Sequence, residues 1–352
     1  MPTRPAVWTC ANDLFLIEIM SENPLTSILM PVKNAQPFLT ECLKSILAQD
    51  TPHWELIAVD DHSTDGSKCV LEHYASLDQR ISVLRNRGAG IIDALATAMD
   101  HSSGQLITRM DADDLMSPHK IRLMSGELIS KGTGHLVIGL VKYFSDDVLG
   151  RGYQQYESWL NRLTSSGANY EDIYRECTIP SPCWMTFKED LLHIGGFSVL
   201  QYPEDYDLAF QFKYSGLTLI AITEILHYWR DYTSRTSRTD PHYADNRFTT
   251  LKVGHFLHRE RVNELPLALW GAGRRGKLIA KELINKGASF HWLTNNTKKI
   301  GHNIYGVNIE TAQDLFQMPS SQVITAIASK EGHQDRINKM QTLTHHQFYH
   351  FV

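Results

Sequence analysis

The sequence is poor in cysteine, and the few cysteines it has are scattered. The five in its 352 residues are odd in number and form no CxxC pair. This usage excludes a disulfide framework and a cysteine-based zinc site, because both need paired or closely spaced thiols. We therefore expect free thiols in a reducing compartment, which predicts a cytoplasmic location.

Long apolar runs and an excess of basic charge are also missing. No stretch approaches the ~20 apolar residues that cross a bilayer. The apolar run 14–20 contains Glu18 and lacks a small-residue cleavage site, so no signal peptide is expected. Lys and Arg total 34 against 39 Asp and Glu, which gives a net charge of −5. This charge balance excludes nucleic acid as a partner. Because no run of residues is long enough to span a bilayer, only peripheral contact with a membrane surface is expected.

The remaining composition is that of a folded chain with more than one domain. Hydrophobic residues make up 42% of the sequence, which is enough for a core, and 352 residues favour two domains. Residues 1–22 fit no pattern that follows and are predicted to be a disordered tail. The other predicted segments are an α/β domain over 23–240, a connector over 241–264 and a smaller α/β domain over 265–352.

Short apolar runs alternate with helical patterns from Ser27 onward. Strands separated by single helices predict a doubly wound, mostly parallel sheet. Such sheets bind ligands at the carboxyl ends of their strands. The four runs that predict buried strands are 27–32, 55–61, 81–86 and 104–114.

Carboxylates follow two of these predicted strands. Asp60 and Asp61 end one run, and Asp111 and Asp113 lie two positions apart at the end of another. Two carboxylates at that spacing on an extended turn can face one cleft. Mg²⁺ prefers one or two carboxylates completed by phosphates and water, so the pattern predicts a metal–phosphate site. A helix-capping turn is the alternative explanation of DDHSTDGS at 60–67.

Five sequence blocks stand in a fixed order between about Ser27 and Arg238: PVKNAQPFLTECLKSILAQ, WELIAVDDHSTDGS, GIIDALATAM, GQLITRMDADDLMSPHKI and GGFSVLQYPEDYDLAFQFKYSG. In order and spacing they resemble the family-2 glycosyltransferases, which have the GT-A fold. The resemblance implies an inverting transfer of a sugar from a nucleotide-diphosphate sugar to a hydroxyl of a glycan or lipid-linked acceptor. It also implies Mg²⁺ or Mn²⁺ as cofactor and a place in surface polysaccharide or lipopolysaccharide biosynthesis.

The resemblance also implies roles for individual residues on the donor side. One of the paired aspartates would accept a hydrogen bond from the nucleotide base, and which one is left open. Asp113 would hold the metal on the diphosphate together with Asp111, which would also touch the ribose. The donor-binding residues predicted in this way are Pro31, Val32, Asn34, Asp60, Asp61, Arg109 and Asp111.

A further acidic block, PEDYDL at 203–208, matches the family's position for the general base. Asp205 is the predicted base and Glu204 the second choice, because an inverting transfer needs a carboxylate that takes the acceptor hydroxyl's proton. A helix N-terminus that favours negative charge would also explain these acids. The chain departs from the family at Lys33, where Tyr is usual. It departs again at Tyr232, which is expected to replace poorly a His that helps to bind metal or diphosphate.

Three glycines form a GxGxxG pattern between a predicted strand and a predicted helix: Gly271, Gly273 and Gly276. This context predicts a Rossmann-like domain. The next predicted strand ends in WLTNN without an acid for a ribose, so tight NAD binding is not expected. Gly273 and Gly276 are instead expected to let the helix pack closely on its strand. The alternatives to a transferase are a nicotinamide-dependent oxidoreductase or epimerase and a non-catalytic nucleotide-sugar-binding protein.

Overall fold

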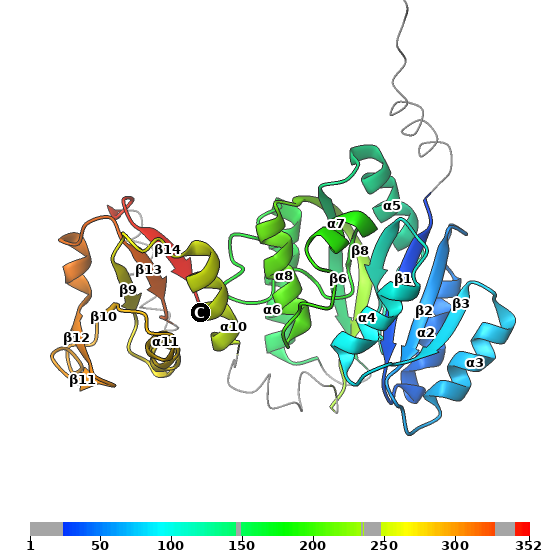
Figure 1. Cartoon of the computed structure of the whole chain (residues 1–352), viewed down its shortest axis with the longest axis horizontal. Helices are drawn as coiled ribbons and strands as arrows, with labels where there is room; N and C mark the ends of the chain where they lie inside the picture. The colour runs from blue at the N-terminus through cyan, green and yellow to red at the C-terminus, as the bar shows by residue number, and fades with distance from the viewer. Residues whose placement is uncertain (1–23, 146–148, 234, 236–247, 328–341) are drawn as a thin grey trace, which may run out of the picture. The chain divides into compact units, whose positions relative to one another are not determined.

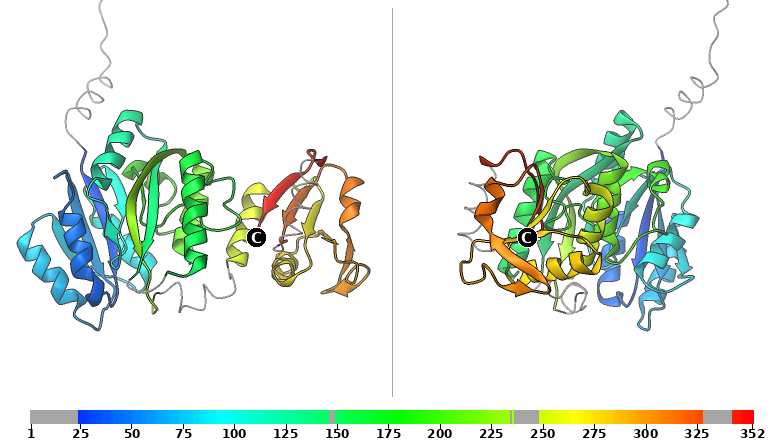
Figure 2. Two further views of the ribbon diagram at one scale, coloured as in Figure 1. Left: turned by 180° about the vertical axis from the view of Figure 1, so that it is seen from behind. Right: turned by 60° about the vertical axis from the view of Figure 1, so that its left-hand side comes forward.

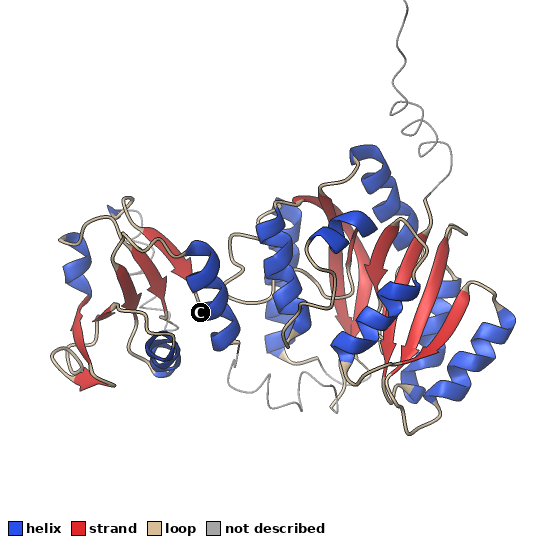
Figure 3. Cartoon of the chain, viewed as in Figure 1, coloured by secondary structure: helices blue, strands red, loops and turns tan. Residues whose placement is uncertain are grey.

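The computed structural model describes residues 24–145, 149–233, 235, 248–327 and 342–352 (Figure 1). The predicted tail 1–22 lies outside the described residues. Contacts divide the chain into two compact units. The first comprises Met1–Gly167, Ile179–Leu200 and Ser215–Tyr232, and the second comprises Ala168–Thr178, Gln201–Tyr214 and Thr233–Val352. Each unit contains its own sheet (Figure 3).

The sheet of the first unit is parallel at one side and mixed at the other. Its strand order is β3-β2-β1-β4-β7-β6-β8-β5. Neighbours are parallel from β3 to β4, whereas β7 is antiparallel to both β4 and β6. The strands are β1 (Thr26–Val32), β2 (Trp54–Asp60), β3 (Ile81–Arg85), β4 (Leu106–Arg109), β5 (Leu115–Met116), β6 (His135–Phe144), β7 (Trp184–Phe187) and β8 (Thr218–Arg230).

Helices cover both faces of this sheet, because alternate residues of each strand point to opposite sides. Ile28, Met30 and Val32 of β1 pack in one core cluster with buried residues of α2 and α3. Helix α4 packs against β1 and β2 with buried residues outside that cluster, so it covers the other face. Figure 2 shows the layers from two further directions. The helices are α2 (Gln36–Leu47), α3 (Ser67–Leu77), α4 (Ile91–His101), α5 (Lys120–Lys131), α6 (Arg151–Ser166) and α7 (Lys188–His193).

The second unit has a smaller sheet in the order β11-β12-β10-β9-β13-β14, parallel except for β11 with β12. The predicted second sheet is therefore present, while its Rossmann-like assignment stays a prediction. Its strands are β9 (Leu267–Trp270), β10 (His291–Thr294), β11 (Asn303–Ile304), β12 (Val307–Thr311), β13 (Gln322–Thr325) and β14 (Gln347–His350). The helices are α8 (Glu204–Ser215), α10 (Thr249–His255), the π-helix η2 (Phe256–Glu260), α11 (Arg274–Asn285) and the 3-10 helix η3 (Ala312–Phe316).

The two units group the segments differently from the predicted boundaries at 240 and 264, which stay a prediction. Helix α8 lies within the predicted first domain, yet it clusters with the C-terminal part of the chain. The described part of the predicted connector forms α10 and η2 and belongs to the same unit. Sequence patterns report local periodicity, whereas this grouping depends on contacts between distant segments.

The glycine turn before α11 is explained by close backbone packing at two of its three glycines. A Cβ on Gly276 would lie 2.0 Å from the carbonyl oxygen of Gly271. Gly271 has a φ of +131°, and a Cβ there would lie 2.5 Å from the oxygen of Ala326. A Cβ on Gly273 would meet no atom within 4 Å, so the packing role expected of Gly273 is wrong. The Gly271 oxygen itself accepts a hydrogen bond from the Trp292 indole at 3.0 Å.

This difference predicts the outcome of a matched pair of substitutions. Gly276→Ala should lower the free energy of unfolding of the second unit by ~2 kcal/mol or more, because its methyl group collides with backbone. Gly273→Ala should change it by less than ~0.5 kcal/mol. Urea unfolding followed by tryptophan fluorescence checks both, since Trp270 and Trp292 lie in this unit's sheet. Equal effects of the two substitutions would contradict the packing explanation.

Candidate active site

The carboxyl ends of three neighbouring strands bring the predicted donor-side residues together. Val32 of β1 pairs in register with Asp60 of β2, and the Asp61 amide donates to the Val32 oxygen at 2.7 Å. On the other side of β1, Leu29 pairs with Arg109, the last residue of β4. The acidic loop therefore starts beside the β1 end. The sheet order changes direction between β1 and β4, where doubly wound sheets bind ligands.

Asn34 connects the loop after β1 to the loop after β2. Its φ of +49° places it in the left-handed region, which Asn tolerates better than most residues. Its main-chain N–H donates to Ser63 Oγ at 3.0 Å, and its side-chain Oδ1 accepts from the main-chain N–H of Thr64 at 2.8 Å. These bonds give Asn34 a loop-fixing role. Its predicted contact with the donor remains a prediction.

Asp61 is the more heavily bonded of the paired aspartates. Its Oδ1 accepts from Asn86 Nδ2 at 2.6 Å and from the Gly90 amide at 3.0 Å, and its Oδ2 lies 3.0 Å from the Lys33 ammonium. Burial raises the pKa of Asp61, but these hydrogen bonds outweigh burial and hold the pKa below its usual value. The carboxyl group is therefore ionised at neutral pH. Asp60 Oδ1 accepts from the Ser63 amide at 3.2 Å.

The acidic loop after β4 carries the two predicted metal-side carboxylates. Arg109, which is 4% exposed, holds Asp111 with Nε at 3.0 Å and a terminal nitrogen at 2.9 Å from Oδ1. Asp113 is half-buried, and its Oδ2 accepts from the Tyr232 hydroxyl at 2.9 Å. The expectation that Tyr232 substitutes poorly for a His that helps to bind metal or diphosphate stays a prediction. Its hydroxyl lies within hydrogen-bond distance of the predicted metal carboxylate.

A buried polar network behind this loop was not among the sequence predictions. Asp114 is fully buried, with Oδ2 2.9 Å from His227 Nε2 and Oδ1 accepting from the Arg230 amide at 2.8 Å. The Arg230 side chain donates from Nε to the Asp113 carbonyl oxygen at 2.8 Å and also bonds Glu41. The sequence signal that could have indicated this network is the HxxR pair His227 and Arg230, three positions apart on one strand. Asp114, which bonds both residues, lies more than 110 positions away in sequence.

The predicted base candidates lie in the first turn of α8, in the second unit. Glu204 is 3% exposed, whereas Asp205 is half-buried. Asp205 Oδ1 accepts from the Tyr206 amide at 2.8 Å. Because a general base must reach its substrate, the greater exposure favours Asp205 over Glu204.

The acids of the donor side fit a metal site completed by a bound diphosphate better than a site whose ligands all come from the protein. Within the described ranges, no group of three or more His, Cys, Asp or Glu side chains is placed to hold a metal ion. Mg²⁺ needs fewer, since one or two carboxylates suffice when diphosphate and water complete the shell. Asp113 and Asp111, two residues apart, are the predicted members of that set.

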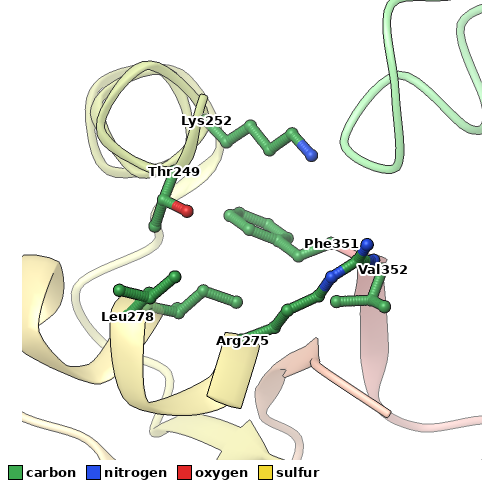
Figure 4. Close-up of a pocket in the computed structure, with 7 residues that line it drawn as sticks. Thr249, Lys252, Arg275, Leu278, Phe351 and Val352 are labelled. Atoms are coloured by element: carbon green, nitrogen blue, oxygen red, sulfur yellow. The ribbon is translucent and has the colours of Figure 1, made fainter. Parts of the chain in front are cut away.

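A separate pocket lies within the second unit, between α10 and α11 (Figure 4). Lys252 and Arg275 line it with Phe351, and none of the predicted site residues does. Burial lowers the pKa of Lys252 to about 8. Its ammonium donates to the Arg175 oxygen at 2.8 Å, which gives it a structural partner.

None of the described helices is both long and apolar enough to span a bilayer.

The mixed, parallel-rich sheet of the first unit matches the fold of GT-A-like glycosyltransferase structures. Residues 27–195 match the family described as glycosyl transferase family 2, which supports a family-2 glycosyltransferase domain over this segment. It is 37% identical over 101 residues to TuaG of Bacillus subtilis (strain 168), a glycosyltransferase named for teichuronic acid biosynthesis. That match covers 28% of this chain and 39% of TuaG. The chain spans less than half the length of the first curated relatives it matches.

Two solved structures share the fold. S. aureus TarS 1-349 in complex with UDP-GlcNAc superposes with a TM-score of 0.53 at 15% identity, over 68% of each chain. The mannosyltransferase PcManGT from Pyrobaculum calidifontis in complex with GDP-Man and Mn²⁺ gives 0.50 at 20% identity, over 75% of this chain and 71% of that one. At these identities the likeness concerns the fold alone.

Proposed function

We propose that this protein is an inverting, metal-dependent glycosyltransferase that moves a sugar from a nucleotide-diphosphate sugar to a hydroxyl of a surface-glycan precursor. The observation that carries the proposal is the Asp111–Asp113 pair. It follows the central strand β4 at the switch point of the sheet, within a family-2 domain. Such a site suits a diphosphate and a divalent cation, Mg²⁺ or Mn²⁺.

Different donor-side residues would bind the base, the ribose and the diphosphate of the donor. Pro31 and Val32 line the end of β1 for the base, with Asp60 or Asp61 accepting a hydrogen bond from it. Arg109 fixes the orientation of the Asp111 carboxylate. That carboxylate would contact the ribose of the donor. Asp113 would hold the cation on the diphosphate, and the cation, when bound, would stabilise the negative charge of the departing nucleotide.

The acceptor side needs a base and an attacking oxygen. Asp205 accepts the proton of the acceptor hydroxyl as that oxygen attacks the anomeric carbon from the face opposite the leaving group. This displacement inverts the anomeric configuration. The nucleotide-sugar complexes of the two fold relatives support the donor class, and the TuaG name supports a surface-glycan acceptor. We place the reaction in the cytoplasm, where nucleotide sugars are used.

A ligand screen tests the proposal. The full chain is heated with UDP-, GDP-, CDP- and ADP-sugars and with NADH, each with Mn²⁺ and with EDTA. At least one nucleotide sugar should raise the melting temperature, more so with Mn²⁺, because a ligand that binds only the folded state stabilises it. Stabilisation by NADH alone would favour the oxidoreductase alternative.

Turnover then separates an enzyme from a binding protein. The donor found in the screen is incubated with simple glycoside acceptors, and nucleotide diphosphate release is followed. Proton NMR of the product reports the anomeric configuration, which should be opposite to that of the donor. Binding without release under all acceptor conditions would support the non-catalytic alternative, and a retained configuration would contradict the inverting assignment.

A further inference from the structure

Helix α8, which carries the predicted base, is held in place by other elements of the second unit. Asp207 lies in the same turn of α8 as Asp205, and its side chain is 4% exposed. Its Oδ1 accepts from His255 Nε2 at 2.6 Å, and its Oδ2 accepts from the Gln201 amide at 2.7 Å. His255 is the last residue of α10 and is itself 12% exposed. The first turn of α8 is thus tied through one carboxylate to another helix and to the preceding loop.

The contacts continue along the same face of α8. The Phe210 ring stacks on the His255 imidazole with centroids 4.2 Å apart. One turn later, Lys213 Nζ and the Tyr214 hydroxyl donate to Glu260 Oε1 at 2.7 and 3.1 Å. Positions 207, 210 and 214 follow the i, i+3, i+7 spacing of one helix face. This face is therefore fixed, both in rotation and along its axis, by α10 and η2.

We infer that His255 is a positioning residue for the acceptor-side base. We also infer that α10 and η2 of the second unit support sugar transfer by holding α8 in position. The inference rests on the proposed function, with Asp205 as the base. A base must sit within hydrogen-bond reach of the proton it takes, and a misplacement of ~1 Å can cost ~10²-fold in rate. Without the His255 bond, Asp207 loses one of the two contacts that set the turn containing Asp205.

A favourable charge at the helix N-terminus would explain Asp207 without any role for His255. That explanation does not account for the use of both Asp207 carboxylate oxygens as hydrogen-bond acceptors. It also leaves unexplained an imidazole that both donates to Asp207 and stacks on Phe210. The two explanations also predict different results. A simple helix-end charge predicts that removing His255 leaves the chemical step unchanged.

The test compares His255→Ala with His255→Gln in the full chain. His258→Ala is the matched control, since His258 lies in η2 and is exposed. His255→Ala should lower kcat by roughly 10-fold or more while the Kd for UDP or GDP with Mn²⁺ stays within about 2-fold. His255→Gln, whose amide can still donate to Asp207, should recover most of the loss. Wild-type kcat in His255→Ala would overturn the inference.

Hydrogen exchange supplies a readout that needs no turnover. Amides of residues 206–210 should lose protection in His255→Ala and keep it in His258→Ala, because the first turn of α8 loses its anchor. Unchanged protection at these amides would also overturn the inference. If the wild type transfers no sugar from any donor, the proposed function fails, whereas the exchange result still decides whether His255 holds α8.

Discussion

Asp113→Ala should abolish most transfer activity while leaving the fold intact. The side chain is the proposed bridge between the chain and the metal–diphosphate, and losing ~4 kcal/mol of charge stabilisation lowers kcat by about 10³-fold. Folding should survive because Asp113 is half-buried and its main-chain oxygen keeps the bond from Arg230 Nε. The measurement is nucleotide diphosphate release with Mn²⁺ present, at saturating donor and acceptor.

Tyr232→Phe separates the metal role from a structural one. It removes the hydroxyl that bonds Asp113 Oδ2 but keeps the ring that packs 4.5 Å from Phe38. Its effect on kcat should be smaller than that of Asp113→Ala, since a hydrogen bond to a charged carboxylate is worth ~1.5–3 kcal/mol. Wild-type-like turnover in Asp113→Ala would refute the metal assignment, and equal losses in both variants would point to loop geometry instead.

Asp205→Asn should lower kcat by a factor on the order of 10² or more, with donor affinity little changed. The substitution keeps the size of the side chain and an Oδ1 that can still accept from the Tyr206 amide. Only the basic lone pair is lost. The measurement is kcat for transfer beside the Kd for the nucleotide with Mn²⁺.

Glu204→Gln is the comparison for this prediction. Glu204 is 3% exposed, so its substitution should affect unfolding before it affects proton transfer. A folded Glu204→Gln protein with a large loss of kcat, beside a nearly normal Asp205→Asn, would move the base by one residue.

The strand ends on the donor side were predictable because their signals are local. Strand ends such as Val32 and Asp60 follow from short apolar runs, and parallel strands bring their carboxyl ends to one edge by geometry alone. The partners of those residues were less accessible. Pairing Asp114 with His227 requires knowing that the loop after β4 lies beside β8, which no periodicity reports. Gly273 shows the same limit, since a glycine pattern does not reveal which of its positions lacks room for a Cβ.

The acceptor side depended still more on long-range contacts. The resemblance of the acids at 203–208 to the family's acidic block predicted Asp205 as the base, but nothing local links α8 to residues beyond 248. The hydrogen bond between Asp207 and His255 spans 48 positions, and contacts of this range group α8 with the C-terminal part of the chain. The predicted boundary at 240 lies between these two elements.

The interleaved path of the chain through its two units limits how relatives can be recombined. Segments 168–178 and 201–214 belong with the C-terminal part, while 179–200 and 215–232 return to the first sheet. No single crossover point divides the units. A chimera joined at 240 would match α8 of one parent with α10 and η2 of the other. Pairs such as Lys213 with Glu260 would then have to be transferred jointly, so exchanging the second unit between relatives calls for coordinated substitutions in both segments.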